Sequence, residues 1–138
     1  MDYQAVNLQD RVDIDNLFSA YVYAIDDGDA GTWISLFTAE GAFIVPGLDD
    51  FVGQEGLRSM AEMVINGSQG HWRHMATNIL VTPTDSADAV NVRLRTLVTD
   101  WSTEPAGLQF NDYTGELVKQ NGVWKINTLT VIPSKVIV

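Results

Sequence analysis

The chain has no cysteine among its 138 residues, which excludes disulfides and thiolate zinc sites. Basic residues are few: 8 Lys and Arg stand against 18 Asp and Glu, giving a formal net charge of -10. Such a charge disfavours nucleic acid and anionic membranes, so we expect neither as a partner. The N-terminus has no signal-like apolar run, and no segment is long enough to span a bilayer. We therefore expect a soluble, cytoplasmic protein.

What the chain does contain is apolar surface, since 46% of its residues are hydrophobic. That share is too high for a disordered chain, and the length suits one domain with its own core. No internal repeat or low-complexity segment divides the sequence. We expect a single domain over residues 1–138.

The spacing of apolar residues changes along the chain from a helical to a strand period. Helical spacing predicts helices over 8–27, 30–37 and 53–66, with a short strand at 41–47. Alternation and β-branched residues then predict strands over 71–82, 89–102, 108–120 and 123–135. This order predicts an α+β fold, a cone-shaped barrel in which three N-terminal helices cover a curved antiparallel sheet. An aromatic cone of this kind is a natural small-molecule pocket.

Three carboxylates crowd the end of the first predicted helix, where the helix dipole disfavours them. Asp29 precedes the second helix and is typical of an N-cap, while Asp27 falls on the solvent side. Asp26 lies at the edge of the apolar face. It is therefore either a rim residue that binds loop amides or a carboxylate directed into the cone.

The only two histidines lie together in the segment "GHWRHMATN". Strand alternation puts Trp72, His74 and Asn78 on one face and His71 on the other. His74 could be a satisfied buried histidine. With a carboxylate behind it, however, it becomes a general base that works near neutral pH.

Three segments, "LFSAYVYAIDDGDAGTWISLFTAEGAF", "RHMATNILV" and "DYTGELVKQNGVWKI", closely resemble SnoaL-like proteins of the nuclear transport factor 2-like superfamily. Asp26 together with His74 resembles a narrower branch of that superfamily. This branch includes scytalone dehydratase, hexachlorocyclohexane dehydrochlorinase and bile-acid 7α-dehydratase.

The resemblance implies a catalytic Asp26–His74 dyad that needs neither a metal nor an organic cofactor. Tyr21 matches a pocket tyrosine of the branch and is either a proton donor or a core aromatic. No second histidine matches the one that scytalone dehydratase carries on the following strand. Arg95 in that region could hold an anion or lie on the surface.

The expected pocket is mostly aromatic and apolar, which suits a small hydrophobic substrate such as a polyketide, a steroid or an aromatic compound. Its expected substrate-binding residues are Phe18, Trp33, Phe37, Phe43, Trp72, Asn78, Arg95, Leu97, Trp101, Phe110 and Tyr113.

Dehydration by a cofactor-free lyase is the first expectation for the reaction. A polyketide or terpenoid cyclase or an isomerase would use the same dyad, and a non-catalytic binding or assembly subunit would use only the pocket. We also expect a homodimer or homotrimer. The outer sheet face is expected to offer apolar residues to a second copy, namely Val92, Leu94, Val98 and Leu117 or their neighbours.

Overall fold

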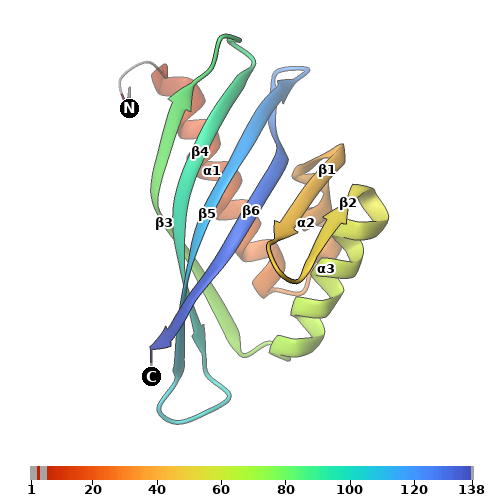
Figure 1. The fold of residues 1–138 in the computed structure, drawn as a ribbon, viewed down its shortest axis with the longest axis vertical. Coiled ribbons are helices and arrows are strands. Elements are labelled where there is room, and N and C mark those ends of the chain that lie inside the picture. The colour runs from red at the N-terminus through yellow and green to blue at the C-terminus, as the bar shows by residue number, and fades with distance from the viewer. Residues whose placement is uncertain (1–2, 4–5, 138) are drawn as a thin grey trace.

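A computed structural model describes residue 3 and residues 6–137, and it has the predicted α+β architecture (Figure 1). The helices are α1 (Leu8–Asp26), α2 (Ala30–Ser35) and α3 (Gly53–Ser68). The strands are β1 (Phe37–Val45), β2 (Asp49–Val52), β3 (Trp72–Pro83), β4 (Ala89–Asp100), β5 (Gly107–Gln120) and β6 (Val123–Ile137). No helix in this described part of the chain is long and apolar enough to cross a membrane.

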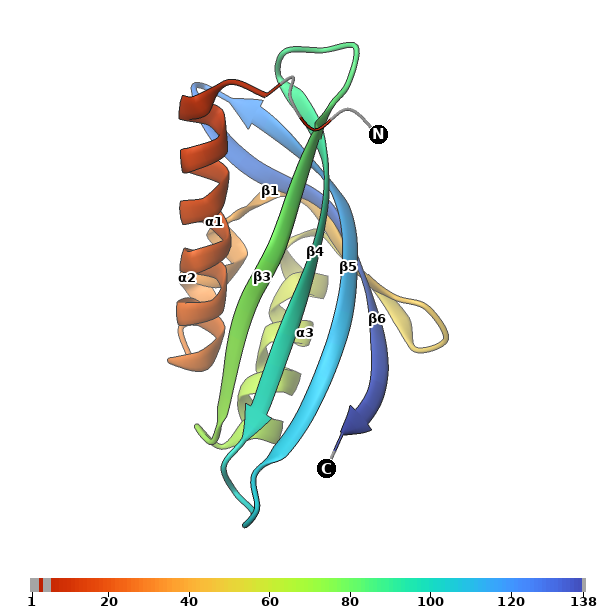
Figure 2. The same cartoon turned by 90° about the vertical axis from the view of Figure 1, so that its left-hand side faces the viewer.

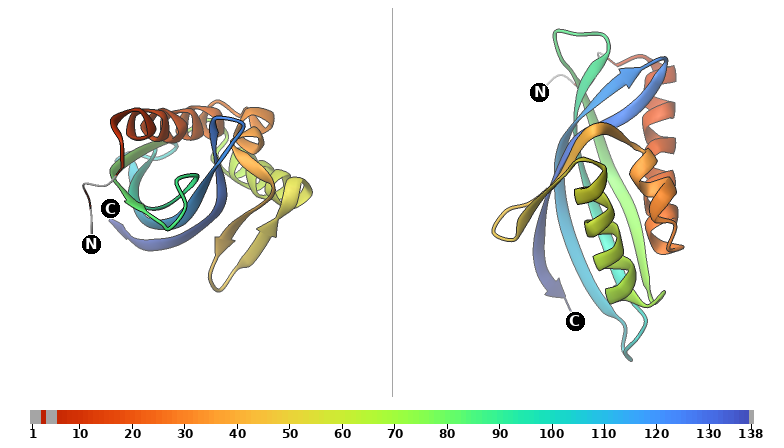
Figure 3. Two further views of the ribbon diagram at one scale, coloured as in Figure 1. Left: turned by 90° about the horizontal axis from the view of Figure 1, so that it is seen from above. Right: turned by 90° about the vertical axis from the view of Figure 1, so that its right-hand side faces the viewer.

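The six strands form one sheet in the order β2-β1-β6-β5-β4-β3. Neighbouring strands are antiparallel except β1 and β6, which run parallel. The sheet curves strongly, and the helices cover its concave side (Figures 2 and 3). Asn121 and Gly122, both at positive φ, form the predicted tight turn between β5 and β6.

Local hydrogen bonds set where α1 ends and α2 begins. Gly28 takes a φ of +77° after the last turn of α1, a conformation that glycine adopts without strain. Asp29 then accepts from the backbone N–H of Thr32 at 3.0 Å and from its hydroxyl at 2.6 Å. Asp29 is thus the predicted N-cap of α2, and Asp27 is exposed as expected. The two helices therefore turn sharply at a defined place, with Asp26 at the turn.

The four residues named for the outer face of β4 and β5 lie on the inner face instead. Val92, Leu94, Val98 and Leu117 are all buried, and they face the helices. The exposed positions of β4 are Asn91, Arg93 and Arg95, so its outer face is polar over residues 91–95. Shifting a strand by one residue moves every side chain to the other face of the sheet. The face that carries the apolar side chains is the one that becomes buried.

The first turn of α1 is tied to the sheet through Asp10. One of its carboxylate oxygens accepts from the Trp124 indole N–H at 3.1 Å and from the Lys119 ammonium at 3.2 Å. Asn7 donates to the other oxygen at 2.9 Å. Burial by itself would raise the pKa of Asp10, but the bonds from Trp124 and Lys119 outweigh it and lower the pKa. Asp10 is therefore a charged tie between α1 and strands β5 and β6.

The sequence did not predict β2, and it placed the start of β1 too late. The segment "DDFV" begins with two aspartates, which are uncommon in strands. It is nevertheless extended because it pairs with β1 and buries Phe51. Tertiary pairing overrides local preference here.

Candidate active site

A cavity of about 260 Å³ lies between the helices and the concave face of the sheet. The exposed side chains of Leu48 and Met63 contribute to its lining. Apart from Leu48, every lining residue belongs to a helix or to one of the strands. The full lining is Tyr21, Ile25, Trp33, Phe43, Val45, Leu48, Met60, Met63, Val64, Trp72, His74, Val98, Gln109, Asn111, Tyr113, Val131 and Pro133.

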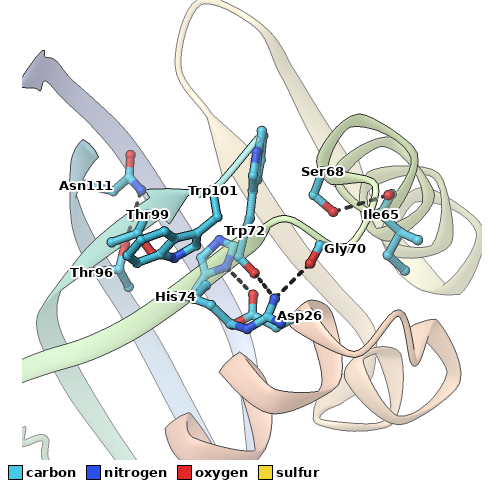
Figure 4. A network of polar contacts seen from close by, with 11 residues as sticks. Asp26, Ile65, Ser68, Gly70, Trp72, His74, Thr96, Thr99, Trp101 and Asn111 are labelled. Atoms are coloured by element: carbon cyan, nitrogen blue, oxygen red, sulfur yellow. Dashed lines mark hydrogen bonds and ion pairs between the residues drawn. The ribbon is translucent and has the colours of Figure 1, made fainter. Parts of the chain in front are cut away.

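Asp26 makes two hydrogen bonds to His74 in the wall of this cavity. Its Oδ1 lies 2.6 Å from His74 Nδ1, and its Oδ2 accepts from the His74 backbone N–H at 2.8 Å. The two side chains are only 9% and 10% exposed. Figure 4 shows the carboxylate at the end of α1 reaching the ring on β3. Bonds to both backbone and ring fix the imidazole relative to the helix.

The arrangement also selects the tautomer of His74. A carboxylate can only accept, so Nδ1 carries the proton of this short contact. The ring nitrogen left for a ligand is then Nε2, which in the neutral ring is a free base. His71, the other histidine, is exposed and belongs to no such pair.

Tyr21 and Tyr113 bring two phenols to the same cavity. Their rings meet edge to face, with centroids 6.3 Å apart, and each residue is only 4% exposed. Burial, and then the neighbouring Tyr113 phenol, raise the pKa of Tyr21 well above its usual value. Burial likewise raises the pKa of Tyr113. Both phenols are therefore protonated donors at neutral pH.

The β5 wall adds a chain of amide hydrogen bonds. Gln109 Nε2 donates to Asn111 Oδ1 at 3.1 Å, and Asn111 Nδ2 donates to Thr96 Oγ1 at 3.1 Å. Thr96 is fully buried, so the Asn111 amide is held in one orientation. Sequence reasoning did not find Gln109 or Asn111. Strand alternation offered a signal, because both share the inward parity of Tyr113.

The structure brings together one part of the expected site. Tyr21, Trp33, Phe43, Trp72, His74 and Tyr113 all line the cavity. Phe18 and Phe37 are buried behind the wall, where Phe18 packs near Tyr21 and Phe37 packs on Trp33. They support the cavity without lining it.

Asn78 does not share the face of His74, contrary to the expected alternation. The register of β3 against β4 shifts between Thr77 and Leu80, and Asn78 sits in this bulge with a φ of +53°. The extra residue reverses the parity of the strand. Asn78 is consequently exposed, on the opposite side of the sheet from the cavity.

Arg95, Leu97, Trp101 and Phe110 also lie outside the cavity lining. Arg95 pairs with Asp112 at 3.1 Å on the outer sheet face, where both side chains are more than half exposed. Leu97 and Phe110 pair with each other across β4 and β5, also with outward parity. Trp101 is 64% exposed and donates its indole N–H to Thr99 at 2.9 Å. Their assignment to the pocket was a parity error.

The cavity carries no formal charge apart from any proton on His74, since no Asp, Glu, Lys or Arg lines it. Within the described residues, no three His, Asp or Glu side chains gather as a metal site would require. The functional groups that line the cavity are thus one oriented imidazole, two phenols and two amides in apolar surroundings.

The chain belongs to the SnoaL-like domain family, whose model matches residues 6–130. The match covers all of the helices and most of the sheet, so the resemblance seen in the sequence is confirmed. A search of curated protein sequences gives no significant match.

Solved structures of the same fold include a candidate scytalone dehydratase from Novosphingobium aromaticivorans. It is 21% identical, with a TM-score of 0.84 over 95% of this chain and 88% of that one. The hexachlorocyclohexane dehydrochlorinase LinA-type3 from Novosphingobium barchaimii is 25% identical, with a TM-score of 0.81 over 94% of this chain and 90% of that one. Aln2 from a Streptomyces species is 19% identical, with a TM-score of 0.83 over 91% of each chain. These structures share the curved sheet covered by helices.

Proposed function

We propose that this protein is a cofactor-independent lyase, most simply a dehydratase, that acts on a small uncharged substrate. The observation that carries the proposal is the pair of hydrogen bonds that Asp26 makes with His74 in the wall of an apolar cavity. One goes to the backbone N–H at 2.8 Å and the other to the ring at 2.6 Å. A solved relative described as a dehydrochlorinase supports elimination chemistry on this fold.

In the proposed reaction, His74 Nε2 removes a proton from a carbon next to a carbonyl group. The electron pair of that C–H bond forms a carbon–carbon double bond, and the C–O bond to a β-hydroxyl breaks. Tyr21 gives its proton to the departing hydroxyl, which leaves as water. The proton on His74 then returns to the Tyr21 phenolate through solvent, so the protein ends unchanged.

Each protein group has a separate task in this scheme. Asp26 fixes the His74 tautomer and stabilises the imidazolium that forms. Tyr21 and Tyr113 are neutral donors at the pH where His74 acts, because burial raises the pKa of both phenols. The uncharged lining fits a neutral, flat substrate better than a carboxylate or a phosphate.

A panel of cyclic β-hydroxy ketones tests the proposal, with β-hydroxytetralone as its first member. Loss of water from that compound gives α-naphthol, which is followed by its absorbance. We expect turnover by the wild type and a rate at least about 100-fold lower for His74→Gln. His71→Gln is the matched control, because it removes an exposed histidine three residues away.

A non-catalytic binding protein is the second candidate, because the cavity alone is enough to bind a ligand. The same panel separates the two functions. Binding of several members without turnover, and with equal affinity in Asp26→Asn and His74→Gln, would establish the binding function instead. A cyclase or isomerase would convert the panel to products that retain the hydroxyl oxygen.

A further inference from the structure

The Trp33 indole N–H is a buried hydrogen-bond donor without a partner in the described structure. Trp33 is 1% exposed and lines the cavity. An indole nitrogen can only donate, and leaving such a group buried and unpaired destabilises the folded protein. The indole N–H groups of Trp101 and Trp124, by contrast, both have acceptors. Trp33 is the exception that needs an explanation.

Only one of the aromatic neighbours of Trp33 carries an acceptor. Its ring centroid lies 4.7 Å from that of Phe37 and 5.8 Å from that of Phe43, and neither ring has an oxygen. The third neighbour is Tyr21, at 5.6 Å between centroids and 51° between planes. Among these ring neighbours, Tyr21 alone offers the Trp33 N–H an acceptor, its phenol oxygen.

We propose that Trp33 is a positioning residue for Tyr21, whose oxygen accepts the Trp33 N–H as Tyr21 gives up its proton. The contact falls short of hydrogen-bond geometry in this structure, and it strengthens when negative charge develops on the phenol oxygen. An interaction that is stronger in the transition state than in the ground state accelerates the chemical step.

The electrostatics of the pair agree with this geometry. Burial and the Tyr113 phenol raise the pKa of Tyr21, whereas the Trp33 N–H acts in the opposite direction and lowers it. An N–H that lowers the pKa of a phenol favours its ionised form. The short connection between α1 and α2, fixed by Gly28 and the Asp29 cap, keeps the two rings in contact.

The inference rests on the proposed function, because it assigns Tyr21 as the proton donor. Ionisation of Tyr21 can nevertheless be measured without any substrate. A polyfluorinated tyrosine, which ionises at lower pH than tyrosine, is placed at position 21 and titrated by fluorine NMR. The titration is run in the wild type and in Trp33→Phe. Trp101→Phe is the matched control, because it removes an indole that already has its own acceptor.

We expect the pKa at position 21 to rise by about one pH unit in Trp33→Phe and to stay unchanged in Trp101→Phe. Benzothienylalanine at position 33, in which sulfur replaces the N–H, keeps the ring shape and guards against a folding defect. It should give the same rise. An unchanged pKa in both Trp33 variants would overturn the inference, whether or not the protein is an enzyme.

Turnover of the β-hydroxy ketone panel separates the two claims. The inference predicts that Trp33→Phe lowers kcat about tenfold and leaves KM within about twofold. A shifted pKa together with full turnover by Tyr21→Phe would overturn the catalytic role of the pair while leaving the proton abstraction by His74 standing. A turnover at least about 100-fold lower in His74→Gln is the separate test of that abstraction.

Discussion

The carboxylate of Asp26 binds His74 through both the ring and the backbone, at 2.6 and 2.8 Å. The second bond matters because it fixes the strand as well as the side chain. The protein's own hydrogen bonds therefore hold the imidazole in place relative to α1. Such preorganisation removes the need to orient the base during the reaction.

Substitution at the dyad should separate orientation from chemistry. His74→Gln removes the base, and we expect kcat to fall by about 100- to 10,000-fold. Asp26→Asn keeps the shape but lets the amide donate to the ring, which favours the wrong tautomer, so we expect a loss of about 100-fold or more. Initial rates with a β-hydroxy ketone that the wild type turns over check both values. Asp27→Asn, one residue later and exposed, should keep full activity. Equal rates for Asp26→Asn and Asp27→Asn would contradict the role of Asp26.

Tyr21 should contribute to rate across the whole neutral and mildly alkaline range. Its pKa is raised by burial and by Tyr113, so the phenol keeps its proton beyond the usual value of about 10. We expect Tyr21→Phe to lower kcat about 100-fold, and we expect this factor to be the same at every pH between about 6 and 9. The pH profile of kcat in the wild type and the variant tests this. A Tyr21 contribution that disappears as pH rises through this range would show that the phenol ionises there, contrary to its burial.

Asp10 should make stability depend on acid pH. Its pKa is lowered in the folded protein because the bonds from Trp124 and Lys119 outweigh burial, whereas an unfolded aspartate ionises near pH 3.9. A folded-state pKa below the unfolded value adds stability that is complete above about pH 5 and is lost as pH falls through the folded value. We expect Asp10→Asn to cost about 1 kcal/mol at pH 7 and progressively less below about pH 4. Urea unfolding at several pH values measures the difference.

Asp13→Asn is the control for that series, because Asp13 lies one turn away and bonds only to exposed Gln9 among the described side chains. Its free energy of unfolding should stay within about 0.5 kcal/mol of the wild type at each pH. A pH dependence equal to that of Asp10→Asn would mean that the effect comes from net charge.

Two glycines test the packing of the sheet and of α3. A Cβ on Gly115 would lie 2.3 Å from the backbone oxygen of Thr128, so Gly115→Ala should destabilise the protein by about 2 kcal/mol or more. A Cβ on Gly67 meets nothing within 4 Å, and this residue is helical. Gly67→Ala should therefore stabilise by about 0.5 kcal/mol. Thermal unfolding of the two variants should move the melting temperature in opposite directions.

Most of the architecture follows from periodicity. Helical spacing located all three helices within a few residues, and alternation located the four long strands. The sharp stop at Asp27-Gly28 and the cap at Asp29 were readable because turn and cap chemistry is local. The short strand β2 was not readable, since its conformation depends on pairing with β1.

Apart from Phe18 and Phe37, which are buried behind the wall, the site residues that sequence reasoning misplaced share one cause, which is strand parity. The bulge at Asn78 reverses β3, and no local pattern in "MATNILV" marks where an extra residue is inserted. On β5, Phe110 and Tyr113 were both placed inside although residues three apart face opposite ways on a regular strand. Placing Tyr113 inside and Phe110 outside would have predicted that Gln109 and Asn111, the two amides that line the cavity, also point inward.

The measurement that most directly tests the central claim is the tautomer of His74. Nitrogen-15 NMR of ring-labelled histidine distinguishes a protonated from an unprotonated ring nitrogen without any substrate. The wild type should show His74 with its proton on Nδ1 and a bare Nε2, while exposed His71 averages between forms. Asp26→Asn should abolish the fixed form. A His74 ring that averages like His71, or that carries its proton on Nε2, would contradict the Asp26–His74 base.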